Sequence, residues 1–67
     1  MSEYEQGATV QFTGGLGRGD DPTTVHTGIV NGSTVFEGGG AWVPIHVREL
    51  NRNLVVLSTN IVKVVTA

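Results

Sequence analysis

The sequence contains no cysteine, few charged residues and no long apolar run. Without cysteine, neither a disulfide nor a thiolate metal site can stabilise the chain. The longest uninterrupted apolar run is the four residues Leu54–Leu57, far short of the ~20 residues that a membrane-spanning helix needs. Residues 2–6 show neither the basic nor the apolar region of a secretory signal. A cytoplasmic location is the default expectation, since no cysteine reports on the redox state.

The length of 67 residues predicts one small domain. We expect residues 1–6 to form a disordered N-terminus and residues 7–67 to form the domain. A domain of this size buries only about 60% of the surface of its unfolded chain, and it is marginally stable unless something adds to its core. Because no disulfide is available, oligomerisation or binding to a larger partner is the leading candidate for that addition.

The charges are few and unevenly distributed. Residues 1–37 carry five of the six acidic residues, whereas residues 38–67 carry three of the four basic ones. The net charge is −2. Binding to a nucleic-acid backbone requires several clustered cations, so the composition does not favour a general nucleic-acid binder.

The residue types that are abundant predict a sheet. Eleven valines, three isoleucines and eight threonines are stiff at χ1 and fit a pleated strand better than a helix, and ten glycines separate them. No window of a dozen residues has helical spacing of its apolar positions. The fold class that we expect is all-β, with strands at residues 7–13, 23–31, 33–37, 41–47, 54–57 and 61–65.

Alternation assigns the faces of two of these strands. In the first strand Ala8, Val10 and Phe12 share one face, which predicts a half-buried strand. In the fourth strand the odd positions from Ala41 to Val47 are apolar and are expected to face the core. The even positions, with Trp42, Pro44 and His46, are then expected to lie outside. Proline cannot donate to a ladder, so Pro44 suggests an edge strand or a bulge.

Glycine-rich segments connect the strands. Residues 14–22 hold four glycines and a proline and predict a long loop. Asn31-Gly32 predicts a type I′ hairpin turn between the second and third strands, because that turn needs a positive φ at both central positions. Gly38–Gly40 is expected to be a flexible break.

The last third of the chain has more apolar side chains than one interior can take. In Leu54–Leu57, and again in Ile61–Val65, both alternating faces are apolar. A small barrel has a single interior, so about half of these side chains should point outward. Exposed apolar patches of that kind normally mark an interface. We therefore expect the outer face of the last two strands to contact copies of the chain or another protein.

The segment Leu57-Ser58-Thr59-Asn60-Ile61-Val62-Lys63-Val64 resembles the end of SH3-type barrels, where a strand, one 3₁₀ turn with a Ser-Asn pair and a closing strand follow each other. The Gly7-x-x-Val10-x-Phe12 opening and Gly28-Ile29-Val30 resemble strands of bacterial SH3-like and KOW-type barrels. The resemblance implies a five- to six-stranded SH3-like barrel with one 3₁₀ turn before the last strand. The Ala-Leu-Tyr-Asp opening of peptide-binding SH3 domains is absent, so recognition of proline-rich peptides is not implied.

Trp42 is the most prominent candidate for a contact residue. It is the only tryptophan, and alternation puts it opposite the core face. Exposed tryptophans are frequent interface anchors, but large aromatic residues are also buried on average, so Trp42 can instead cover an open end of the barrel. The expected protein-interface residues are Trp42, His46, Val55, Leu57, Val62 and Val65.

Other polar groups give weaker hypotheses. His26 and His46 are both expected on outward positions, where neighbouring strands could pair them, but two histidines without a third ligand make no zinc signature. Arg48 and Arg52, with Lys63, form the only basic cluster. No nucleophile and base can be paired, so we expect no catalytic residue, no metal and no cofactor.

The function that we expect is that of a non-enzymatic interaction module, which acts through protein–protein contacts or homo-oligomerisation. The first alternative is a KOW- or Tudor-like nucleic-acid or ribonucleoprotein accessory protein that uses Arg48, Arg52 and Lys63. The second is a small oligomeric enzyme with a site at a symmetry axis. Its precedent is the short SH3-like trimethoprim-resistant dihydrofolate reductases, whose Val-Gln-Ile-Tyr pore strand this sequence lacks.

Overall fold

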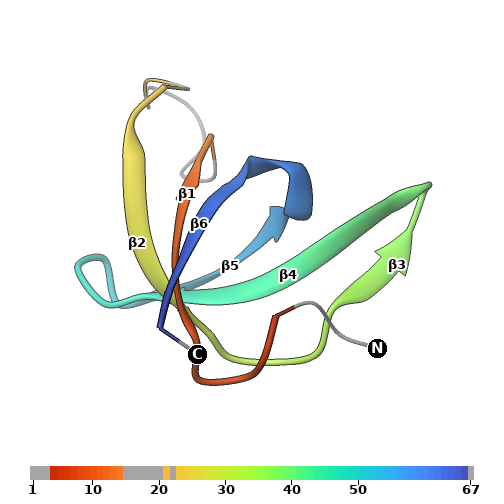
Figure 1. Ribbon diagram of the computed structural model, residues 1–67, viewed down its shortest axis with the longest axis horizontal. Helices are drawn as coiled ribbons and strands as arrows, with labels where there is room; N and C mark the ends of the chain where they lie inside the picture. Colours follow the sequence, from red (N-terminus) through yellow and green to blue (C-terminus); the bar gives the residue numbers. More distant parts are fainter. Residues whose placement is uncertain (1–3, 15–20, 22, 67) are drawn as a thin grey trace.

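The computed structural model describes residues 4–14, 21 and 23–66 and has six strands in one antiparallel sheet (Figure 1). The strand order is β3-β4-β2-β1-β6, and β5 pairs with the other edge of β4. The elements are β1 (Thr9–Thr13), β2 (Val25–Val30), β3 (Val35–Glu37), β4 (Gly40–Val47), β5 (Arg52–Leu57), the 3₁₀ turn η1 (Ser58–Asn60) and β6 (Ile61–Thr66). The all-β class and the 3₁₀ turn before the last strand are confirmed.

The buried hydrophobic residues form one core. It is built from inward-facing residues of four strands and the chain just before β1. Val10 and Phe12 of β1 are fully buried, as are Val43 and Ile45 of β4. The alternation predicted for these two strands is thus confirmed. Tyr4, ahead of the expected domain boundary, packs partly buried against this core.

Strand β4 pairs with three other strands. Its whole length beyond Ala41 pairs with β5, while its opposite edge pairs first with β3 at residues 40–42 and then with β2 at residues 45 and 46. Pro44 falls between these two partners. Its carbonyl accepts a hydrogen bond from the Asn31 amide at 3.0 Å. Because the amide and carbonyl of one residue point to the same side of an antiparallel strand, the missing N–H of Pro44 falls in the gap between β3 and β2. This placement explains how a central strand tolerates proline.

The hairpin predicted at Asn31-Gly32 is wrong. Strand β2 pairs with β1 and β4, not with β3, and neither Asn31 nor Gly32 has a positive φ. Gly32 instead lies against the ring of Pro44, because a Cβ at Gly32 would lie 2.9 Å from the proline Cγ. The dipeptide connects two strands that pair with different parts of β4.

The tight hairpin lies at the segment expected to be a flexible break. Gly38 and Gly39 have φ of 61° and 81°, and Glu37 pairs with Gly40 across them. A positive φ at both central positions is what a type I′ turn needs, and Gly-Gly supplies it without strain. The turn type is the one expected, but it forms at Gly38-Gly39 and not at Asn31-Gly32, because Glu37 of β3 pairs with Gly40 of β4.

Strand β6 contains two irregularities against β1. Phe12 pairs with Ile61 and Gln11 with Lys63, so Val62 is an extra residue on β6. A second shift between Val10 and Thr9 makes Val65 the other extra residue. A bulge interrupts the strict alternation of faces. The two apolar faces expected for Ile61–Val65 therefore arise partly from two inserted valines.

The hydroxyl of Thr34, in the connection before β3, is buried and has no hydrogen-bond partner among the described residues. Because an unpaired buried hydroxyl costs desolvation energy, Thr34→Val should raise the free energy of unfolding by about 1 kcal/mol. Urea denaturation measures this change, and Thr27→Val, at an exposed threonine of β2, is the control, expected to stay within about 0.5 kcal/mol. A loss of stability in Thr34→Val would show that the hydroxyl is bonded.

Candidate interaction surface

The outer face of β3, β4 and β5 carries a group of exposed and half-buried apolar residues that neighbour one another. In one row across the sheet, Trp42 pairs with Val35 on β3 and with Leu57 on β5. In the next row Pro44 pairs with Val55. Residues opposite each other in an antiparallel sheet point to the same side. The surface formed by Val35, Trp42, Pro44, Val55 and Leu57 is called the outer patch below.

Trp42 is held within this patch by its own polar atom. The indole Nε1 donates to the carbonyl oxygen of Glu37 at 3.1 Å, and the residue is 37% exposed. The ring is therefore fixed on the sheet, with part of its apolar surface open to solvent. This arrangement satisfies the donor and leaves an aromatic surface for a partner. The outward placement expected for Trp42 is observed, and its role as an interface anchor stays a prediction.

Polar side chains border the outer patch at the end of β4 nearest β2. His46 Nδ1 lies 2.8 Å from Oδ1 of Asn53, and the same oxygen accepts from Nδ2 of Asn31 at 3.0 Å. An amide oxygen can only accept, so Nδ1 of His46 is the donor in this contact. These contacts join β4, β5 and the residue after β2, and they make a polar boundary beside the apolar patch.

The six expected interface residues do not all lie together. Trp42, Val55 and Leu57 belong to the outer patch, and His46 borders it. Val62 and Val65 are 62% and 46% exposed, but they lie on β6, at the end of the strand order away from β5. The sheet thus brings four of the six residues together and separates two.

The two histidines are not neighbours, and the outward placement expected for His26 is wrong. His26 shares a face of β2 with Gly28 and Val30, which are buried, and its ring centroid lies 5.7 Å from that of Phe12. His46 lies on the outer face of β4. The alternation pattern did not distinguish the two faces of β2, because Gly28 has no side chain to mark its face as apolar.

The three basic residues are also divided. Arg48 and Arg52 lie at the two ends of the turn between β4 and β5, whereas Lys63 pairs with Gln11 at the β6 edge. All three are exposed. The described residues therefore place two of the three cations together, at the β4–β5 turn.

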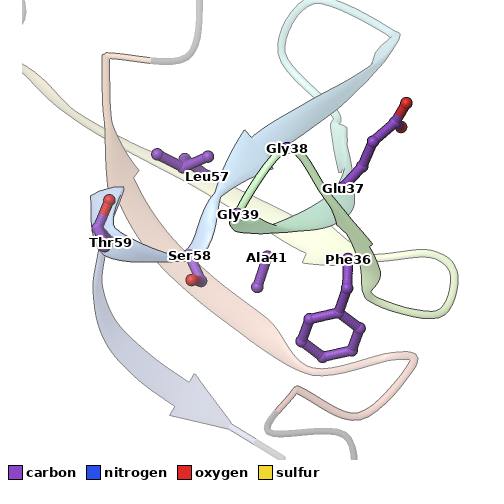
Figure 2. Close-up of a pocket in the computed structure, with 9 residues that line it drawn as sticks. Phe36, Glu37, Gly38, Gly39, Ala41, Leu57, Ser58 and Thr59 are labelled. Atoms are coloured by element: carbon purple, nitrogen blue, oxygen red, sulfur yellow. The ribbon is translucent and has the colours of Figure 1, made fainter.

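A groove of about 660 Å³ runs between the β3–β4 hairpin and η1 (Figure 2). Figure 2 shows Phe36, Ala41 and Ser58 projecting in the same direction from three adjacent segments, while Glu37 points the other way. Phe36 pairs with Ala41 and is 76% exposed. A second depression of about 310 Å³ lies beside His46 and Arg48. Sequence reasoning did not single out Phe36, because a strand of three exposed residues shows no periodicity.

The loop expected at residues 14–22 lies largely outside the described residues, which include only Gly14 and Asp21 of it. The carboxylate of Asp21 accepts hydrogen bonds from the amide of Thr23 at 2.8 Å and from its hydroxyl at 2.7 Å. These bonds, the amide first, lower the pKa of Asp21. Their contribution to the stability of the fold is present at neutral pH, where the carboxylate is ionised. It is lost as the pH falls through the lowered pKa.

The part of the chain that the structure describes holds no group of three or more potential metal ligands. Within the same residues no helix is long and apolar enough to cross a bilayer. The chain matches no family model, and comparison with curated proteins and with solved structures also finds no match. The outer patch and the groove beside it are thus the candidate contact surfaces of the described residues.

Proposed function

We propose that this protein is a non-enzymatic interaction module whose contact surface is the outer patch. The observation that carries the proposal is the placement of Trp42, with its indole nitrogen bonded to Glu37 and its ring beside exposed Val35 and half-buried Leu57. Interfaces are enriched in partly exposed aromatic anchors that are surrounded by apolar side chains and bordered by polar ones. His46 and Asn53 supply that polar border.

The energetics of a 67-residue chain support the same proposal. Val55 and Val35 are 59% and 51% exposed on the outer patch. Fully burying a side chain of this type stabilises by about 1.5–3 kcal/mol. A partner on the outer patch would thus supply apolar burial that a small core cannot. The partner is another protein or a second copy of the chain.

The strand order and the position of η1 also support a finer structural proposal, that the fold is an SH3-like barrel. A first strand that pairs with both the second and the last, and a 3₁₀ turn that leads into that last strand, agree with the resemblance in the sequence. Strands β5 and β6 are not paired among the described residues, so the barrel would be closed there by side chains and η1. The cytoplasmic location stays a prediction.

Val55→Asp tests the proposed surface. The charge falls within the outer patch, beside Pro44, so the dissociation constant for a protein partner should rise at least about tenfold. The measurement is retention of cellular proteins by the immobilised chain, followed by titration of each protein retained. Val25→Asp is the matched control, since Val25 is 50% exposed on β2, away from the patch.

A partner retained by wild type and Val25→Asp, but lost by Val55→Asp, supports the proposal. Equal retention by all three chains, or retention of no protein, contradicts it. Nucleic acid would be recognised differently, through Arg48 and Arg52. Retention of DNA or RNA with an affinity that falls steeply with salt, unchanged in Val55→Asp, would favour the nucleic-acid accessory function instead.

A further inference from the structure

Strand β3 is an edge strand at one side of the molecule. Its three residues, Val35, Phe36 and Glu37, are all exposed, and among residues 4–14, 21 and 23–66 the strand pairs only with β4. Figure 1 shows β3 and the adjoining end of β4 reaching out from the rest of the sheet, with β3 outermost. An uncovered edge of this kind presents backbone donors and acceptors to any chain that can pair with it.

The phase of the β3–β4 ladder shows which backbone groups face outward. In a two-residue hairpin the residues that flank the turn exchange hydrogen bonds, and here these are Glu37 and Gly40. The groups that bond to a given neighbour alternate along an antiparallel strand. The amide and carbonyl of Phe36 therefore point away from β4, at the centre of the free edge.

Few of the usual devices protect this edge. Natural edges are blunted by very short strands, charged side chains, proline or bulges, and β3 has only its length of three residues and Glu37. Among residues 33–42, all of which the structure describes, Glu37 is the only charged residue and proline is absent. Phe36 is 76% exposed and projects on the same side as Ala41 (Figure 2). An exposed phenylalanine thus lies at the one position whose backbone is also free to pair.

We propose that a second copy of this chain pairs with β3 in an antiparallel arrangement about a two-fold axis, with Phe36 opposite the partner's Phe36. This register makes Phe36 a hydrogen-bonded pair, because its outward amide and carbonyl meet the same groups of the other copy. Val35 then lies opposite the partner's Glu37. The two Glu37 carboxylates are kept apart, so the only charge of the hairpin does not oppose the contact.

In the same arrangement, side chains of the two copies form one continuous row along the groove. On the inner face the row from Ala41 to Phe36 is extended by the partner's Phe36 and the partner's Ala41, and aromatic cross-strand pairs are favourable. The hydrogen-bonding groups of Phe36 are self-complementary about the two-fold axis, and the register opposes no like charges, which favours a second copy over an unrelated strand. The exposed parts of Val35, Phe36 and Trp42 amount to on the order of 300 Å² per copy, so the dimer belongs to the weak class of interfaces.

Phe36→Asp tests the contact in the purified full chain. Wild type should dimerise reversibly over about 10 µM to 1 mM, measured by sedimentation equilibrium, and two facing aspartates should raise the dissociation constant at least about tenfold. The control is Val62→Asp, which adds the same charge at a valine of β6 that is 62% exposed. A monomeric wild type at 1 mM, or a dimer lost equally in both variants, would overturn the proposal.

A second measurement tests the register and does not depend on Phe36. Because the chain has no cysteine, Val35→Cys and Glu37→Cys each introduce a single thiol. The pair of Val35 and the partner's Glu37 is non-hydrogen-bonded, with Cα atoms about 4.5 Å apart, which suits a disulfide. Under mild oxidation a mixture of the two variants should form mixed disulfide dimers several-fold faster than either variant alone. Equal rates would overturn this register.

The dimer does not rest on the proposed function, because it is argued from the backbone edge of β3. The two surfaces share Val35 and Trp42, but Val55 belongs only to the outer patch and Phe36 only to the dimer contact. Loss of partner retention in Val55→Asp with an intact dimer would leave both proposals standing. A monomeric wild type that still retains its partner would remove only the dimer.

Discussion

Gly28→Ala is expected to lower the free energy of unfolding by about 1–3 kcal/mol or more. Gly28 is buried in β2, where its backbone lies against two core side chains. A Cβ at this position would lie 2.3 Å from Cγ2 of Ile45 and 3.3 Å from Cε1 of Phe12. Real Cβ atoms do not approach other atoms to 2.3 Å, so β2 or β4 would have to move. A chain of this length has about 3–10 kcal/mol of stability in all, so the loss is a large part of it.

Urea denaturation of Gly28→Ala measures this loss, and a second substitution shows its cause. Ile45→Leu removes the methyl group at the closest approach, and alone it should cost less than about 1.5 kcal/mol. If the contact with Ile45 carries the effect, the double variant Gly28→Ala, Ile45→Leu will be more stable than the sum of the single losses predicts. Additive losses, or a stable Gly28→Ala variant, would contradict the close packing of β2 on β4.

Phe12→Ala should have an effect of at least equal size, lowering the free energy of unfolding by about 3–5 kcal/mol. Phe12 is fully buried, and its ring packs beside His26 and under Gly28. Removing the ring leaves a cavity at the centre of a single small core, where β1, β2 and β6 meet. We expect the Phe12→Ala variant to unfold well below the melting temperature of the wild type and to have a much lower urea midpoint.

Phe36→Ala is the matched control for Phe12→Ala, since it makes the same substitution at a residue that is 76% exposed. Measured at low micromolar concentration, where the proposed dimer is dissociated, it should change the free energy of unfolding by no more than about 0.5 kcal/mol. Similar losses in the two variants would show that the core is not organised around Phe12.

The sequence predicted the parts of the fold that depend on local alternation. Val10 and Phe12, and likewise Val43 and Ile45, recur at every second position beside polar or exposed neighbours, and they do form the core. The partners of each strand were not predictable in the same way. Asn31-Gly32 has the residues of a hairpin, but β4 is long enough to take β2 and β3 in succession along one edge. Which strands pair with that edge of β4 decides the topology. No single segment of the sequence indicates this pairing.

The candidate surface was predictable only in part for the same reason. Alternation in β4 indicated that Trp42 faces outward, yet its neighbours Val35 and Leu57 follow from the registers of two other strands. The prediction grouped Val62 and Val65 with Trp42 because β5 and β6 follow each other in the sequence, whereas β6 pairs with β1 and not with β5 among the described residues. Phe36 was missed because its importance comes from its place at a free edge.

The pairing of β1 with β6 has a consequence for how the chain reaches its native state. Strands β3, β4 and β5 are joined by short turns and can pair early, because closing a short loop costs little entropy. Phe12 and Ile61, in contrast, lie near opposite ends of the chain and meet in the sheet. Such non-local pairing is slow in folding. We therefore expect the core around Phe12 to be completed last, with the apolar residues of the β4–β5 hairpin exposed to solvent until then.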